Sequence, residues 1–242
     1  MSLQRIHTLL VLLTVTSCQP QSPNNFADQG IYFNLRDYYY PAYKLLEPTV
    51  YCYADSTGEI KMYMQHHISI NGTDSTLVTW SYDSAFILKA KSAEIYGDSG
   101  IYLGTMEVGR PGKLLVKGSI DSGFTAWQQP LQSDSISFFY SFTLTNGTIT
   151  LRSDMSGYFT EVSDSIQTMP YRREDCVLMH TFYKGEAGGP FLETETMANN
   201  ANMVYAKGVG MIYSQEPNGG KMTKYYLQKI APASEFPALT QK

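Results

Sequence analysis

Three cysteines and four histidines are the side chains of this 242-residue sequence that are best suited to metal or nucleophilic chemistry. His66 and His67 are adjacent, so on a strand they point to opposite faces and cannot hold one ion together. His66, His180 and Cys176 have the right ligand types for a soft metal site, but nothing in their spacing requires one. We therefore expect no metal site and no cofactor.

Catalytic motifs are equally weak. The nucleophile elbow Gly-x-Ser-x-Gly does not occur in the sequence. The acidic residues between positions 161 and 175 are scattered, so their spacing indicates no carboxylate pair for glycoside cleavage. We therefore expect a non-enzymatic protein.

The first eighteen residues predict a covalent modification. Arg5 supplies a positive charge, and the apolar run 9–15 is too short to span a bilayer, as in a signal peptide. Residues 15–18 (Val-Thr-Ser-Cys) resemble the lipobox of bacterial lipoproteins. The resemblance implies that residues 1–17 are removed and that Cys18 carries acyl chains such as palmitate. Three chains form a stable anchor, since each buried CH₂ contributes about 0.8 kcal/mol.

Cys52 and Cys176 remain after acylation. An oxidising compartment permits a disulfide between them, which would contribute on the order of 4–5 kcal/mol by closing a long loop. The alternative is two buried free thiols, because each cysteine lies in a strand-like run. Both interpretations stay open at this point.

Composition excludes nucleic acid as a partner. The formal charge of the whole chain is −4. Residues 1–17 contain Arg5 and no acidic residue, so the rest of the chain has 17 basic and 22 acidic side chains and a charge of −5. An acidic domain without a basic cluster has no electrostatic footprint for nucleic acid. Hydrophobic residues make up 43% of the chain, which is enough to build a substantial core.

Alternating polarity with a period of two dominates the remainder and predicts strands. In 59–70, one face carries Met62, Met64, His66 and Ile68. Turn residues such as Asn-Gly separate the runs, as in hairpins. The strands expected are 48–54, 59–70, 77–82, 85–96, 101–108, 113–120, 139–145, 148–152, 157–162, 176–184, 203–214 and 221–230. Only 192–202 could form a short helix.

These elements predict an all-β protein with little helix. We expect a single large, strongly curved antiparallel sheet of about ten to twelve strands, as a half-barrel or open barrel. The domain organisation predicted is a signal peptide (1–17), a flexible tether (18–29), one β domain (30–232) and a C-terminal tail (233–242).

Two short stretches carry a family resemblance. Residues 32–35 (Tyr-Phe-Asn-Leu) and 38–41 (Tyr-Tyr-Tyr-Pro) are similar to the opening of uncharacterised Bacteroidetes lipoproteins. The segment 205–212, with Tyr225-Tyr226-Leu227 after it, resembles their closing hairpin. Those proteins resemble in turn the half-barrels of lipoprotein carriers and lipoprotein-insertion factors. The resemblance implies a concave sheet face that holds acyl chains.

The function expected is binding of a hydrophobic or amphipathic ligand, such as a lipid or acyl chain, in that concave face. Flexible methionines adapt to irregular ligands. The candidate lining residues are Met62, Met64, His66, Ile68, Leu77, Phe86 and Leu88. The alternatives are a surface module that binds glycans or proteins through exposed tyrosines, and a scaffold component of the cell envelope.

The location expected is the outer membrane, reached through the lipid on Cys18. Residues 19–25 lack the acids that resemble a Bacteroidetes surface-export signal, so the periplasmic side is favoured. The membrane is thus a predicted partner, and a lipid or a glycan is the predicted ligand. The sequence indicates no particular protein partner.

Overall fold

The computed structural model describes residues 31–71, 74–109, 115–131, 136–147, 149–166, 168, 170–189, 192–218 and 221–240. The predicted signal peptide, Cys18 and tether lie outside these residues.

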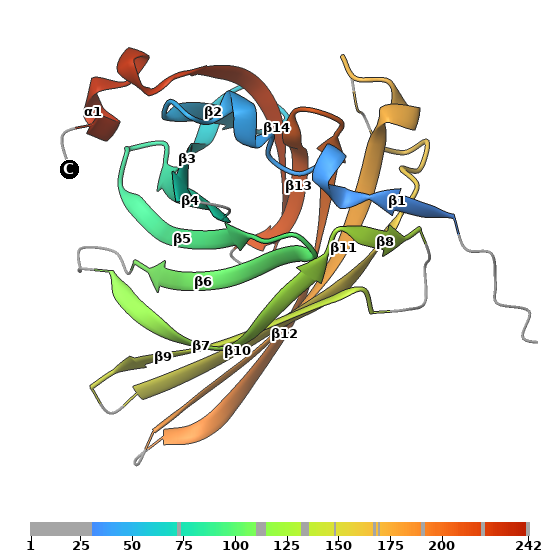
Figure 1. Ribbon diagram of the computed structural model, residues 1–242. Coiled ribbons are helices and arrows are strands. Elements are labelled where there is room, and N and C mark those ends of the chain that lie inside the picture. Colours follow the sequence, from blue (N-terminus) through green and yellow to red (C-terminus); the bar gives the residue numbers. More distant parts are fainter. Residues whose placement is uncertain are drawn as a thin grey trace, which may run out of the picture. The chain divides into compact units, whose positions relative to one another are not determined.

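Twelve antiparallel strands form one closed barrel (Figure 1). Neighbours in the ring are mostly neighbours in sequence, and the ring order is β10-β11-β12-β13-β14-β2-β3-β4-β5-β6-β7-β9. The barrel strands are β2 (Thr49–Ala54), β3 (Ile60–Asn71), β4 (Asp74–Asp83), β5 (Leu88–Tyr96), β6 (Gly100–Val108), β7 (Val116–Ala126), β9 (Phe138–Asn146), β10 (Ile149–Thr160), β11 (Cys176–Gly189), β12 (Leu192–Ala206), β13 (Gly210–Asn218) and β14 (Lys221–Pro232). The remaining two, β1 (Tyr32–Asn34) and β8 (Gln128–Pro130), pair with each other.

Short helices make up the other regular structure. They are η1 (Leu35–Asp37), η2 (Ala42–Lys44), η3 (Arg173–Asp175), η4 (Ala233–Glu235) and α1 (Pro237–Thr240). In the part of the chain that the structure describes, no helix is both long and apolar enough to cross a membrane.

Closure of the ring corrects the sequence prediction. The large antiparallel sheet with little helix is confirmed, but the half-barrel or open barrel is wrong. The last strand, β14, pairs with the first barrel strand, β2, with Ile230 opposite Tyr51 and Ala231 opposite Val50. This pairing satisfies the backbone groups that two open sheet edges would leave exposed.

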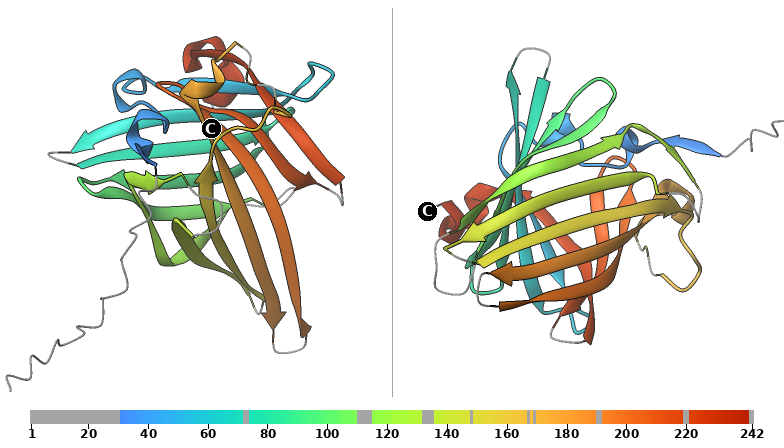
Figure 2. Two further views of the ribbon diagram at one scale, coloured as in Figure 1. Left: turned by 90° about the vertical axis from the view of Figure 1, so that its right-hand side faces the viewer. Right: turned by 90° about the horizontal axis from the view of Figure 1, so that it is seen from below.

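The helix expected at 192–202 is also wrong, because these residues belong to β12. Pairing with β11 continues from Ala206, opposite Cys176, to Leu192, opposite Gly189. The two Asn pairs of this segment give it low helix propensity, so the ladder of a neighbouring strand determines its conformation. Figure 2 shows that β11 and β12 extend together at one end of the barrel.

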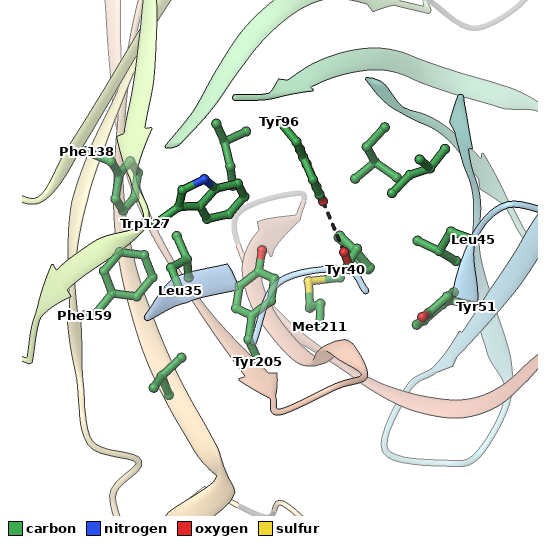
Figure 3. Close-up of a cluster of buried hydrophobic side chains, with 14 of the residues drawn as sticks. Leu35, Tyr40, Leu45, Tyr51, Tyr96, Trp127, Phe138, Phe159, Tyr205 and Met211 are labelled. Atoms are coloured by element: carbon green, nitrogen blue, oxygen red, sulfur yellow. Dashed lines mark hydrogen bonds between the residues drawn. The ribbon is translucent and has the colours of Figure 1, made fainter. Parts of the chain in front are cut away.

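Residues 35–45, which we call the plug, enter the opposite end of the barrel. Leu35, Tyr40 and Leu45 are buried in one cluster with inward-facing strand residues (Figure 3). Three backbone hydrogen bonds of 2.7 Å join the plug to the barrel: Leu35 N to Trp127 O, Gly208 N to Asp37 O, and Ile68 N to Leu45 O. The plug is therefore part of the core.

Tyrosines supply much of this core. Their rings pack while their hydroxyl groups find backbone acceptors, as buried tyrosine requires. Tyr51 donates to Val209 O at 2.8 Å, and Tyr53 donates to Met211 O at 2.9 Å. Seven of the nineteen tyrosines are thus buried members of this interior cluster.

Two further clusters lie on the outside of the strands. One includes Cys176, Leu178 and Val204. The other includes Cys52 and Tyr82, with Ala233 and Leu239 of the C-terminal segment. The stretch 233–240, assigned from sequence to a tail, therefore covers part of the outer sheet face.

The contact between Gly210 and Tyr40 is open to test. Gly210 has φ +104°, and a Cβ there would lie 2.5 Å from Cδ1 of Tyr40. We expect Gly210→Ala to lower the free energy of unfolding by roughly 2–3 kcal/mol in urea denaturation, through backbone strain and overpacking. Gly208→Ala is the control, because φ is +68° there but nothing lies within 4 Å. Equal losses in both variants would contradict the packing of the plug against β13.

Candidate functional site

A cavity of about 280 Å³ lies in the barrel beside the plug. It is surrounded by β5–β7, β9–β12 and the plug, and its walls are mostly apolar and aromatic. Its lining residues are Leu35, Tyr39, Ser92, Glu94, Ile101, Leu103, Met106, Thr125, Phe138, Tyr140, Phe142, Ser153, Met155, Phe159, Met179, Tyr183, Met203 and Tyr205. Ligand sites in proteins are typically concave and apolar, with a few fixed polar groups.

Glu94 is the charged residue of this lining. It faces inward on β5, opposite Leu77 on one side and Leu103 on the other. The register shifts between Ala93 and Glu94, and such bulges re-aim side chains and occur often beside functional sites. The local irregularity of β5 and β6 thus directs a carboxyl group into the cavity.

The plug supplies the hydrogen bond to this carboxyl group. The hydroxyl of Tyr39 lies 3.2 Å from Oε1 and 3.0 Å from Oε2 of Glu94, and donates to the pair. The ring of Tyr39 stacks on that of Tyr205 with centroids 5.4 Å apart and an interplanar angle of 25°. No lysine or arginine among the described residues forms a salt bridge with Glu94.

Burial changes the ionisation of Glu94. Removal from water raises its pKa from 4.5 to about 7, while the hydrogen bond from Tyr39 acts in the opposite direction. The carboxyl group therefore gains or loses its charge near neutral pH. Groups perturbed in this way inside a cavity are candidates for function.

A second hollow of about 290 Å³ adjoins the cavity, and Ser153 and Tyr183 line both spaces. It is lined by residues near the β11–β12 end, including Met197 and Glu216. Burial also raises the pKa of Glu216. A second acidic group thus lines the hollow that adjoins the cavity.

Five of the seven predicted lining residues come together inside the barrel, but next to the plug. Ile68 and Leu77 belong to the plug cluster, and Met62 and Met64 pack against it. The ring of His66 lies 4.0 Å from that of Tyr40 between centroids. None of them lines the cavity, because the plug occupies their side of the barrel.

Phe86 and Leu88 require a correction, because they lie on the outer face. Both pack against the outer cluster that contains Cys52 and Tyr82. The stretch 85–96 is not one strand: Phe86 has φ +59° in the turn after β4. The register then shifts between Ser81 and Tyr82, and Leu88 pairs with the outward-facing Tyr82. One added residue in a ladder reverses the face of those that follow.

Of the two interpretations left open for the remaining cysteines, the structure agrees with the second, since Cys52 and Cys176 are buried free thiols. Cys52 is on β2 and Cys176 begins β11, which places β12, β13 and β14 between them in the ring. Four strand steps of roughly 4.8 Å far exceed the Cα separation that a disulfide spans. Burial raises the pKa of both thiols, that of Cys176 to about 11, so they remain protonated and weakly reactive.

The histidines do not assemble with the cysteines. His66 faces inward and accepts or donates one hydrogen bond at Nδ1, 2.9 Å from Thr79 Oγ1. Burial lowers its pKa to about 3, so it stays neutral. His180 contacts Thr160 and Asn202 through its two ring nitrogens. Within the described residues, no three metal-ligating side chains of the His, Cys, Asp and Glu types gather.

Sequence reasoning missed Glu94 and the methionines of the cavity. A signal was present: Ser92, Glu94 and Tyr96 share one face of an expected strand, which places a carboxyl group beside an aromatic ring. The cavity methionines, which are Met106, Met155, Met179 and Met203, are as flexible as Met62 and Met64. Only the path of the plug shows which side of the barrel is filled and which side holds the cavity.

No protein-family model matches the chain, and no curated protein matches it significantly. Among solved structures, it is similar to a candidate lipoprotein from Parabacteroides distasonis, with 13% identity over 80% of this chain and 98% of that chain and a TM-score of 0.48. It is also similar to a candidate exported protein with a YmcC-like fold from Bacteroides fragilis, with 13% identity over 80% of this chain and 99% of that chain and a TM-score of 0.44. At these identities and scores, neither protein assigns a role to the cavity, which has to be interpreted from its own residues.

The ionisation of Glu94 predicts a pH dependence of stability. Its pKa is raised on folding, so its contribution is fully present below about pH 4.5 and is lost as pH rises through about 7. Relative to Glu94→Gln, the free energy of unfolding of the wild type should fall by roughly 2–3 kcal/mol from about pH 4.5 to roughly pH 8. Urea denaturation of both proteins at each pH measures this difference. The titration of His66 cancels in it, because both proteins contain His66. A difference that does not change with pH would show that Glu94 is solvated.

Proposed function

We propose that this protein binds a small amphipathic ligand inside its barrel. The apolar part of the ligand lies against the methionine and aromatic walls, and its polar end meets Glu94. The observation that carries the proposal is the carboxyl group of Glu94 inside a mostly apolar cavity of about 280 Å³, where it accepts a hydrogen bond from Tyr39. An engineered apolar cavity of about 150 Å³ holds benzene, so the space suits a larger small molecule or part of a chain.

The methionine content of the wall supports this proposal. Four cavity residues are methionines from four different strands, and their unbranched side chains adapt to irregular ligands. A core that served stability alone would be expected to close such a space, because cavities destabilise proteins in proportion to their volume.

A substitution that fills the cavity tests the proposal. Ser153 lines both the cavity and the adjoining hollow, so Ser153→Phe should reduce binding of a neutral naphthalene dye at least about tenfold by removing space. Dye fluorescence at a series of protein concentrations measures the affinity. Ser119→Phe on β7 is the matched control, because Ser119 is exposed, lies opposite Thr143 and does not line the cavity. Undiminished binding in Ser153→Phe, with the fold retained, would refute this site.

We further propose that Cys18 is acylated and holds the barrel at the outer membrane, on the periplasmic side. The support is the sequence of residues 1–18, with its positive charge, short apolar run and lipobox-like ending. The anchor would place the cavity beside a source of amphipathic molecules.

Metabolic labelling tests the anchor. A bacterium that expresses the protein with a palmitate analogue should label the wild type and the Cys52→Ala variant, but not Cys18→Ala. Cys52 is the matched control, because it is a buried thiol. Equal labelling of Cys18→Ala would contradict acylation at this residue.

The glycan-binding alternative has weaker support. Stacking on sugars requires exposed aromatic faces, but many tyrosines are buried in the core. The exposed ones are Tyr32, Tyr43 and Tyr102, which lie in the first strand, in η2 and on β6. Tyr102 pairs with the exposed Phe124, which in turn pairs with the exposed Phe139, and this outer row on β6, β7 and β9 is the surface on which the glycan alternative depends.

A further inference from the structure

The charged side chains that line the cavity and the adjoining hollow are all acidic. Glu94 lines the cavity, and Glu216 lines the adjoining hollow, which shares Ser153 and Tyr183 with it. Among the described residues, no lysine, arginine or histidine lines either space. Low-dielectric walls strengthen such a field, so the interior attracts cations and repels anions.

Aromatic rings surround the same space. Tyr39 and Tyr205 stack beside the carboxyl group, and Tyr140 and Phe138 belong to the same lining. The face of an aromatic ring is negative and attracts a cation, most strongly where water is excluded. A carboxylate bordered by such rings is the arrangement that recognises ammonium groups.

The carboxyl group of Glu94 has capacity for a ligand. Tyr39 provides one hydroxyl donor, whereas an ionised carboxylate has about four acceptor sites. Charge on this group is costly inside the barrel unless a counter-charge arrives with the ligand.

We propose that the ligand is a cationic amphiphile, in which a positively charged amine binds Glu94 and an apolar chain fills the cavity. This inference rests on the function proposed above and narrows its ligand class. A fatty acid would bring a second negative charge toward Glu94, and a neutral alcohol would leave the carboxylate without a counter-ion. The site therefore selects amines over both.

The other ionisable groups around Glu94 leave it as the negative charge that the amine would meet. They are tyrosines: Tyr39 and Tyr40 after η1, Tyr96 on β5, Tyr140 on β9 and Tyr205 on β12. Burial raises the pKa of each of them well above its usual value, and the charge of Glu94 acts in the same direction. These tyrosines stay protonated, so Glu94 is the group that carries charge.

Three ligands with the same chain separate the possibilities: octylamine, octanol and octanoate. Calorimetric titration of the purified protein at roughly pH 8 should show octylamine binding at least about tenfold more tightly than octanol, and octanoate more weakly than either. In Glu94→Gln, the affinity for octylamine should fall to that for octanol or below it, because the ammonium group then lacks a counter-charge, while the affinity for octanol changes little. Tyr39→Phe keeps the carboxylate and loses only the hydroxyl donor, so it should keep the preference for the amine.

The outcomes distinguish the two proposals. Octanol or octanoate binding as tightly as octylamine would overturn the amine inference and leave the amphipathic cavity intact. An amine preference that survives in Glu94→Gln would also overturn it, because the preference would then arise elsewhere. Failure of all three ligands to bind would count against both proposals. Circular dichroism of each variant establishes that the barrel is folded.

Discussion

A closed ring of twelve strands encloses more space than its own side chains can fill, and the rest of this structure follows from that constraint. Eight strands leave an interior that side chains just occupy, whereas wider barrels enclose cavities. Here the plug fills one side with Leu35, Tyr40 and Leu45. The other side remains a cavity lined by methionine, aromatic residues and one carboxyl group. One part of the interior is thus filled by the plug, and the other part holds the cavity in which we propose that a ligand binds.

The plug also determines the chemistry of the space that it leaves. Leu45, in the plug, accepts a hydrogen bond from Ile68 on β3, and Tyr39 donates to Glu94 on β5. The core is therefore held by tyrosine hydroxyl groups as well as by apolar packing. The carboxyl group of Glu94 forms no salt bridge within the described residues. A bulge aims it inward and one hydroxyl group donates to it, and the proposed ligand-binding role rests on this position.

The alternating pattern predicted the strands well, because inward and outward residues of a barrel differ in polarity. It could not predict where registers shift. The turn at Phe86 and the bulge after Ser81 place Leu88 outside, although the period alone put it on the inner face. The strand conformation of 192–202 depends on β11, a partner that local propensity does not contain. Closure depends on pairing between the two ends of the domain, β2 and β14, which no local pattern reveals.

The most direct test of this account is the ionisation midpoint of Glu94. The chemical shift of its side-chain carboxyl carbon can be followed by NMR against pH and assigned by comparison with Glu94→Gln. The account predicts a midpoint near the pKa of about 7 that burial produces, and a further increase in Tyr39→Phe, which removes the hydrogen bond that lowers it. A midpoint close to 4.5, the ordinary value, would show that water solvates this carboxyl group freely and would contradict a ligand cavity built around it.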